Sequence, residues 1–156
     1  MRILATKATV ESGAYLRKIQ KYVQHPMMHI IQQAAPLLVP LIEEGMIYHI
    51  STKEIIRTYL ESFKKENVKN IVLGCTHYPL IKHLIQAEMP EAKIFDSPSV
   101  IPESLENYLS RHPEIEKRLS RSGARRYMTT DNPKKFKKFA QDFLKIDIKS
   151  ERAILT

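Results

Sequence analysis

The residues best suited to chemistry lie in one short segment, 74–79, with the sequence GCTHYP. Cys75 offers a thiolate, which is both a nucleophile and a base. His77, two residues further on, offers a proton carrier or charge partner near neutral pH. Thr76 adds a hydroxyl that can bind a carboxylate, and Gly74 lets the backbone approach a ligand closely. The segment therefore predicts a small site that binds an anion and holds a nucleophile or base.

The position of this segment between a strand and a helix supports that prediction. The apolar run 70–74 is typical of a strand, and Pro79 falls where the next helix should begin. In an open parallel sheet, ligands bind where strands end and helices start, and a helix N-terminus favours a thiolate. Two other segments fit such a position, namely 6–9 and 36–45.

Simpler roles for the same residues stay open. A lone cysteine is commonly a buried, inert core residue, and a lone histidine is commonly a structural hydrogen-bonding group. The combination of Cys75 and His77 on one strand-to-helix turn supports a functional site about as well as these simple roles. Metal binding is not expected, because the two residues alternate on an extended turn and the sequence shows no third ligand cluster.

The elements that must position this turn follow from hydrophobic periodicity. Short apolar runs predict strands, and longer amphipathic stretches predict helices. The expected strands are 2–6, 27–33, 70–74, 92–96, 126–129 and 146–148. The expected helices are 10–22, 53–65, 80–88, 101–111 and 133–144. Their alternation predicts an α/β fold with a mainly parallel sheet flanked by helices.

Two local features refine these elements. The segment 36–45 fits either a short helix stopped by Gly45 or an extended loop. Ser51, followed three residues later by Glu54, predicts a capping box at the start of the helix 53–65. We expect an α/β domain over 1–98 that carries the segment 74–79. Region 99–156 is expected to form a helical connector followed by a strand and a helix.

Composition narrows the class of protein. The chain has 156 residues with 43% hydrophobic and 27% charged residues, which is typical of a globular domain. The longest apolar run, 34–42, contains two prolines and is too short to span a bilayer. The first residues lack the apolar stretch of a signal peptide. A single cysteine excludes an intramolecular disulfide, so a reducing cytoplasm is the expected location.

The charge is uneven along the chain. Residues 111–156 hold 13 basic and 6 acidic side chains, whereas 1–110 are close to neutral. A basic region can bind nucleic acid or phosphate, or it can be a solvated face. Phe136, Phe139 and Phe143 have the spacing of a helical core stripe rather than of a base-stacking surface. A basic nucleic-acid-binding module is therefore the weaker alternative.

Several motifs together resemble one enzyme family. The octapeptide 73–80 (LGCTHYPL) looks like the second cysteine motif of glutamate racemases. Segment 5–15 resembles the start of the family's second half, and 36–45 resembles its acidic motif. Segment 127–133 resembles its closing strand and helix. The resemblance covers essentially the whole chain, in the same order and with similar spacing.

The resemblance implies a reaction and a set of roles. Members of the family interconvert L- and D-glutamate for peptidoglycan synthesis without a cofactor, using two cysteines on opposite faces of the α-carbon. Cys75 matches one of these acid/base residues, and Glu43 and His77 match groups that assist proton transfer on its side. Glu44 is the rival of Glu43, whose alternative role is a solvated carboxylate at a helix end.

The family's substrate contacts carry over in the same way. Thr76, Thr6 and Thr9 fall where the family contacts glutamate through hydroxyls and backbone N–H groups. For Thr6 and Thr9, helix capping is the alternative role.

One departure from the family pattern decides what this chain can do by itself. A single cysteine cannot serve both faces of the substrate, and the family's first domain, with its first catalytic cysteine, has no match here. The chain therefore resembles the C-terminal portion of a glutamate racemase, and residues from about 126 onward would pack on that first domain. The alternatives are an inactive fragment, half of a split enzyme, or a homodimer that places two copies of Cys75 across one cleft.

Overall fold

The computed structural model describes residues 1–23 and 29–155, and they form two compact units, Met1–Leu105 and Glu106–Thr156. The boundary between the units, Leu105–Glu106, lies within helix α6 (Ser97–Arg111), whereas the sequence predicted a division at 98–99, near the start of that helix.

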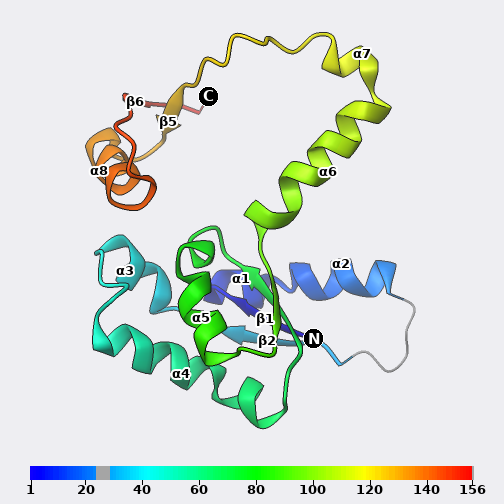
Figure 1. The fold of residues 1–156 in the computed structure, drawn as a ribbon, viewed down its shortest axis with the longest axis vertical. Helices are drawn as coiled ribbons and strands as arrows, with labels where there is room; N and C mark the ends of the chain where they lie inside the picture. Colours follow the sequence, from blue (N-terminus) through cyan, green and yellow to red (C-terminus); the bar gives the residue numbers. More distant parts are fainter. Residues whose placement is uncertain (24–28, 156) are drawn as a thin grey trace. The chain divides into compact units, whose positions relative to one another are not determined.

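The first unit is built on a parallel sheet of four strands (Figure 1). The strands are β1 (Arg2–Ala5), β2 (Ile31–Ala34), β3 (Asn70–Gly74) and β4 (Lys93–Phe95), in the spatial order β2-β1-β3-β4. Each neighbouring pair runs parallel, as the alternation of strands and helices predicted. All four residues of β1 are buried, which fits a central strand covered on both faces.

The register brings the ends of three strands to one level. Ala5, the last residue of β1, lies opposite both Ala34 of β2 and Gly74 of β3. The chain leaves β1 to form β2 on one side and later returns to form β3 and β4 on the other. The carboxyl ends of β1 and β3 therefore flank the point where the strand order reverses, which is where open α/β sheets bind ligands.

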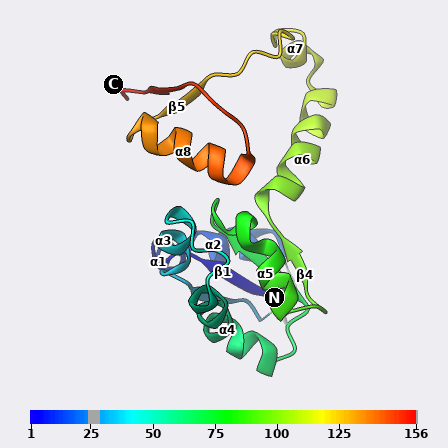
Figure 2. The ribbon, with the colours of Figure 1, turned by 60° about the vertical axis from the view of Figure 1, so that its left-hand side comes forward.

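Helices connect these strands across both faces of the sheet. The first crossover holds α1 (Lys7–Ser12) and α2 (Ala14–Tyr22), and the second holds α3 (Leu38–Glu43) and α4 (Ile50–Lys65). The third holds the 3-10 helix η1 (Tyr78–Ile81) and α5 (Lys82–Glu88). Right-handed crossovers place α4 and α5 on one face and α1 and α2 on the other, and α4 indeed packs against α5 (Figure 2).

The core of the first unit lies around the central strands of the sheet and the helices that cover it. Its completely buried side chains come from the central strands and from the inner faces of the helices. They include Ile3, Leu4, Ile71, Ile56, Leu60, Phe63, Ile81 and Ile85.

Two helix predictions were wrong in detail. The single helix expected over 10–22 is divided by Gly13, whose φ of 60° ends α1 and begins α2. The capping box expected from Ser51 and Glu54 does not form, because α4 starts earlier. His49 caps that helix, its Nδ1 accepting a 3.2 Å hydrogen bond from the Ser51 N–H.

The ambiguous segment 36–45 forms a helix, α3, rather than an extended loop. Gly45, with a φ of 71°, follows its end as predicted. The Gly45 N–H donates to the Ile42 carbonyl, and the Met46 N–H donates to the Leu41 carbonyl. This pair of bonds is the Schellman arrangement that ends many helices. The strand expected over 27–33 is observed as Ile31–Ala34. Residues 27 and 28 of the expected strand lie outside the described part of the chain.

The second unit contains a parallel pair of strands and one long amphipathic helix. After α7 (Pro113–Glu116) come β5 (Tyr127–Thr129), α8 (Pro133–Leu144) and β6 (Ser150–Arg152). The strand expected over 146–148 was wrong, since β6 pairs with β5 two residues beyond it. Phe139 and Phe143 are both half-buried and contact each other, with ring centroids 4.5 Å apart and ring planes tilted by 40°.

Neither a membrane span nor a cluster of metal ligands is found in the part of the chain that the structure describes. No helix there is long and apolar enough to cross a bilayer. No group of three or more His, Cys, Asp or Glu side chains could hold a metal ion there.

The Gly74→Ala substitution should destabilise the first unit, because β3 has no room for a side chain at this position. An added Cβ would lie 2.9 Å from the Ala5 Cβ and 3.1 Å from the Tyr15 ring. We expect urea denaturation followed by circular dichroism to show a loss of about 1–3 kcal/mol in unfolding free energy. Adding Ala5→Gly should recover part of that loss; strictly additive effects would contradict the proposed clash.

Candidate active site

Cys75 lies in a bend directly after β3, at the switch point of the sheet. The residues 75–77 form no regular helix, and η1 begins at Tyr78 with Pro79 in its first turn. The helix expected over 80–88 is therefore observed as the 3-10 helix η1, which begins at Tyr78, followed directly by α5. Cys75 is partly exposed, so it is not a completely buried core residue.

His77 and Glu43 are brought together by the fold. The His77 Nε2 lies 3.2 Å from the Glu43 Oε1, and both side chains are about one-third exposed or less. They are far apart in the sequence and meet because α3 packs against η1. An imidazole in contact with a carboxylate and two residues from a thiol can relay or stabilise a proton at that thiol.

Thr6 and Thr9 form a second polar cluster, after β1. The Thr6 side chain caps α1 by accepting a 3.2 Å hydrogen bond from the Thr9 N–H, so the capping role considered for it does occur. The two hydroxyl oxygens lie 2.9 Å apart. Because Ala5 and Gly74 are paired, Thr6 and Cys75 each follow adjacent strand ends. Thr76 is exposed next to Cys75.

Tyr78 is a site residue that the sequence pattern did not indicate. Its side chain is completely buried, and its hydroxyl donates a 2.8 Å hydrogen bond to the Ala35 carbonyl. Burial, together with the negative charge that Cys75 and Tyr59 can carry, raises the pKa of the Tyr78 phenol well above its ordinary value. The phenol therefore stays protonated and remains a donor. No sequence signal distinguishes this buried tyrosine from an exposed one.

Asp96 and Lys82 were also missed. Asp96 directly follows β4, and its buried carboxylate lies 3.1 Å from the Lys82 Nζ at the start of α5. It also accepts hydrogen bonds from the Ser99 N–H and hydroxyl. The rule that polar residues after parallel strands gather at one edge could have found Asp96, because it ends the expected strand 92–96. The Lys82–Asp96 pair fixes the far end of the segment that carries Cys75.

The electrostatics of Asp96 follow from these contacts. Burial raises the pKa of a carboxyl group, but here the hydrogen bonds from Ser99 and the Lys82 ammonium outweigh it. The pKa of Asp96 is therefore lowered below its ordinary value of 3.8.

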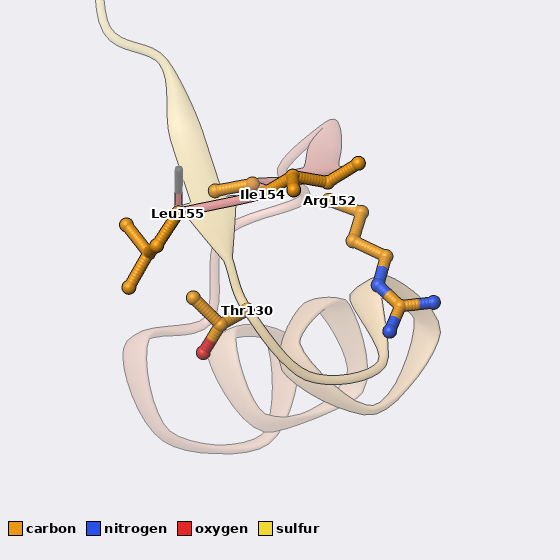
Figure 3. Close-up of a pocket in the computed structure, with 5 residues that line it drawn as sticks. Thr130, Arg152, Ile154 and Leu155 are labelled. Carbon is orange, nitrogen blue, oxygen red and sulfur yellow. The ribbon is translucent and has the colours of Figure 1, made fainter.

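A shallow depression in the second unit offers no comparable chemistry (Figure 3). Thr130, Arg152, Ala153, Ile154 and Leu155 line it. These side chains include no group that takes up or releases a proton near neutral pH. The Cys75 turn with the adjoining His77–Glu43 pair remains the candidate site.

In sequence, the chain is similar to glutamate racemases over nearly its whole length. It is 34% identical over 154 residues to the glutamate racemase of Sulfurihydrogenibium sp. (strain YO3AOP1), a match that covers 99% of this chain and 55% of that protein. It is 36% identical over 142 residues to the glutamate racemase of Neisseria gonorrhoeae, covering 91% of this chain and 52% of that protein. No family model matches the chain.

Solved structures of glutamate racemases are also similar to this chain. The glutamate racemase of Francisella tularensis, crystallised in complex with D-glutamate, superimposes with a TM-score of 0.80 at 29% identity. That of Thermus thermophilus, in complex with β-chloro-D-alanine, gives 0.76 at 32% identity. These matches cover 99% of this chain but only 57% and 56% of those chains. The chain thus spans about half the length of the relatives it matches.

The Asp96→Asn substitution should remove a contribution to stability that depends on pH. A lowered folded-state pKa means that this contribution is complete above the unfolded-state pKa and is lost as the pH falls through the folded-state pKa. At pH 7 we expect the variant to lose about 1–3 kcal/mol of unfolding free energy, and the difference from the native protein should shrink below pH 4. Urea denaturation at pH 7, 4 and 3 measures this.

The control for that measurement is Asp142→Asn, the same change at an exposed position. It should leave stability at pH 7 nearly unchanged. An equal loss in both variants, or a loss for Asp96→Asn that does not vary with pH, would contradict the assignment.

Proposed function

We propose that this chain, which is related along its whole length to glutamate racemases, supplies one face of a glutamate racemase active site. In this proposal Cys75 is one of two thiols that interconvert L- and D-glutamate without a cofactor. The observation that carries the proposal is the Cys75 thiol at the switch point of the sheet, beside the His77–Glu43 pair. The relatedness to glutamate racemases supplies the substrate.

The chemistry explains why the site needs this geometry. Inversion at the α-carbon requires a base on one face and an acid on the opposite face. In one direction the Cys75 thiolate removes the α-proton, and the electron pair left on the carbon takes a proton from a second thiol across the plane. In the other direction Cys75 donates that proton. His77, held by Glu43, would assist the transfer of a proton to or from Cys75 between turnovers.

The threonines fit the carboxylate groups of the substrate. Thr76 presents an exposed hydroxyl beside Cys75, and Thr6 and Thr9 place hydroxyls and backbone N–H groups after the adjacent strand. Such donors would stabilise the charge that builds up on the α-carboxylate when the α-proton is removed. The N–H of Thr9 is already engaged by Thr6, so we expect the hydroxyls to make the contacts.

The second thiol must come from outside these 156 residues, because Cys75 is the single cysteine among them. It could belong to another part of a longer protein, to a separate chain or to a second copy of this one. Since D-glutamate made by such an enzyme serves peptidoglycan synthesis, the proposal includes a cytoplasmic location, where a free thiol stays reduced.

The loss of the circular dichroism signal of D-glutamate, monitored over time, tests the proposal directly. We expect the purified chain alone to give no racemisation. Mixing it with the half of the Neisseria gonorrhoeae enzyme that this chain does not match should produce activity. Cys75→Ser should then lower that activity by about a thousandfold or more, since a hydroxyl is a far weaker base at neutral pH. Mixtures that stay inactive over a wide range of ratios would count against the proposal.

Activity of the chain alone, abolished by Cys75→Ala, would instead indicate a site shared between two copies. Sedimentation of the active species would then have to show a dimer.

The role of Glu43 can be separated from that of its neighbour by a matched pair of variants. In the reconstituted enzyme, Glu43→Gln should lower kcat by about 10–100-fold, because the imidazole loses its charged partner. Glu44→Gln, the same change one residue along at the end of α3, should have little effect. Equal effects of both variants on kcat would contradict the assignment of Glu43.

A further inference from the structure

One backbone residue, Ala35, joins three elements of the candidate site. Its N–H donates a 2.8 Å hydrogen bond to the carbonyl of Ala5, the last residue of β1. Its carbonyl accepts a 3.2 Å bond from the N–H of Leu38, the first residue of α3. The same carbonyl accepts the 2.8 Å bond from the buried Tyr78 hydroxyl. Ala35 is itself completely buried, so water does not compete for these bonds.

Two consecutive residues therefore hold α3 from both sides. Tyr78 bonds the Ala35 carbonyl, which lies in the turn that leads into the helix and also accepts from the N–H of Leu38. His77 contacts Glu43, the residue at which the helix ends. A helix of six residues is only about 9 Å long, so a small rotation at its start displaces its end. The geometry of the Glu43–His77 contact thus depends on how the start of α3 is held.

A second tyrosine bonds the same region from a different element. The Tyr59 hydroxyl of α4 accepts a hydrogen bond of 3.4 Å from the Leu37 N–H. This bond is longer and more exposed than the one from Tyr78. It also does not connect α3 to the turn that carries Cys75, so it offers a matched comparison.

We propose that Tyr78 is a positioning residue whose buried hydroxyl holds α3 against the Cys75 turn and thereby keeps the Glu43 carboxylate in contact with His77. The inference rests on the proposed function only where it takes the Glu43–His77 pair to act on Cys75. Tyr78 itself touches no reacting atom. It acts through the backbone of Ala35 and the orientation of a short helix.

The single cysteine allows the inference to be tested without turnover. The rate at which iodoacetamide alkylates Cys75 between pH 6 and 9 reports the state of the thiol. In the native chain, Glu43→Gln should change this rate by about threefold or more at one or more pH values. In the Tyr78→Phe background the same Glu43→Gln change should have almost no effect, because the Glu43 carboxylate has already lost its contact with His77. In the Tyr59→Phe background the effect of Glu43→Gln should persist.

The Tyr78→Phe change keeps the ring that fills the core and removes only the hydroxyl, so the fold is expected to survive. Amide hydrogen exchange supplies a second measurement: Tyr78→Phe should speed exchange in α3 while leaving the middle of α4 protected. Loss of protection throughout the first unit would indicate general unfolding and would overturn a specific positioning role. An undiminished effect of Glu43→Gln in the Tyr78→Phe background would also overturn it, as would no effect of Glu43→Gln in any background.

The reconstituted racemase separates failure of this inference from failure of the proposed function. If the proposal on function is right, Tyr78→Phe should lower kcat by about tenfold while KM changes by less than about twofold, since the bound substrate keeps its own contacts. If the reconstituted mixture containing the unmutated chain showed no racemase activity, the proposed function would be contradicted. The alkylation and exchange results would still decide the role of Tyr78.

Discussion

The close approach of β1 and β3 at their carboxyl ends is the constraint on which the rest of the site depends. Gly74 lies so near Ala5 and Tyr15 that a single added carbon would collide with both. The absence of a side chain at Gly74 allows Ala5 to pair with it, and Ala5 pairs with Ala34 on its other side. Three connecting segments therefore leave the sheet at the same height. The polar residues that follow them are gathered at one edge because the strands beneath them are in register.

Above that edge, buried polar groups hold the turn that carries Cys75. The Tyr78 hydroxyl bonds the Ala35 carbonyl, and the Lys82 ammonium pairs with the Asp96 carboxylate. The Tyr78 phenol and the Asp96 carboxylate are buried and would be costly to bury without these partners, so each bond is also a positional restraint. The segment between Gly74 and Lys82 is thus fixed at both ends and in the middle. Cys75 and His77 lie between these fixed points, with side chains that are partly exposed.

Under the proposed function, the arrangement explains why half of a site can be preformed while racemisation still needs another part. A parallel sheet with one switch point has one set of carboxyl strand ends where a ligand can bind, and here those strand ends present one thiol. Inversion at carbon needs a proton donor on the side opposite the base, which the same edge cannot provide. A racemase built from such sheets must bring two of these edges together around its substrate. The division of labour follows from stereochemistry rather than from the strength of either acid or base.

The sequence by itself determined the parallel α/β class, β3 and α8 to the residue, and the cysteine turn, because local apolar runs and turn residues carry that information. It left open whether 36–45 forms a helix or a loop, which the structure resolves as α3. It misjudged the break at Gly13, the cap of α4 and the last strand, where a backbone conformation or a partner strand overrides periodicity. Only the tertiary structure decided that Glu43 meets His77, that Tyr78 is buried against Ala35 and that Lys82 pairs with Asp96. These contacts join residues distant in the chain, and their existence depends on how helices pack over the sheet, which no local pattern encodes.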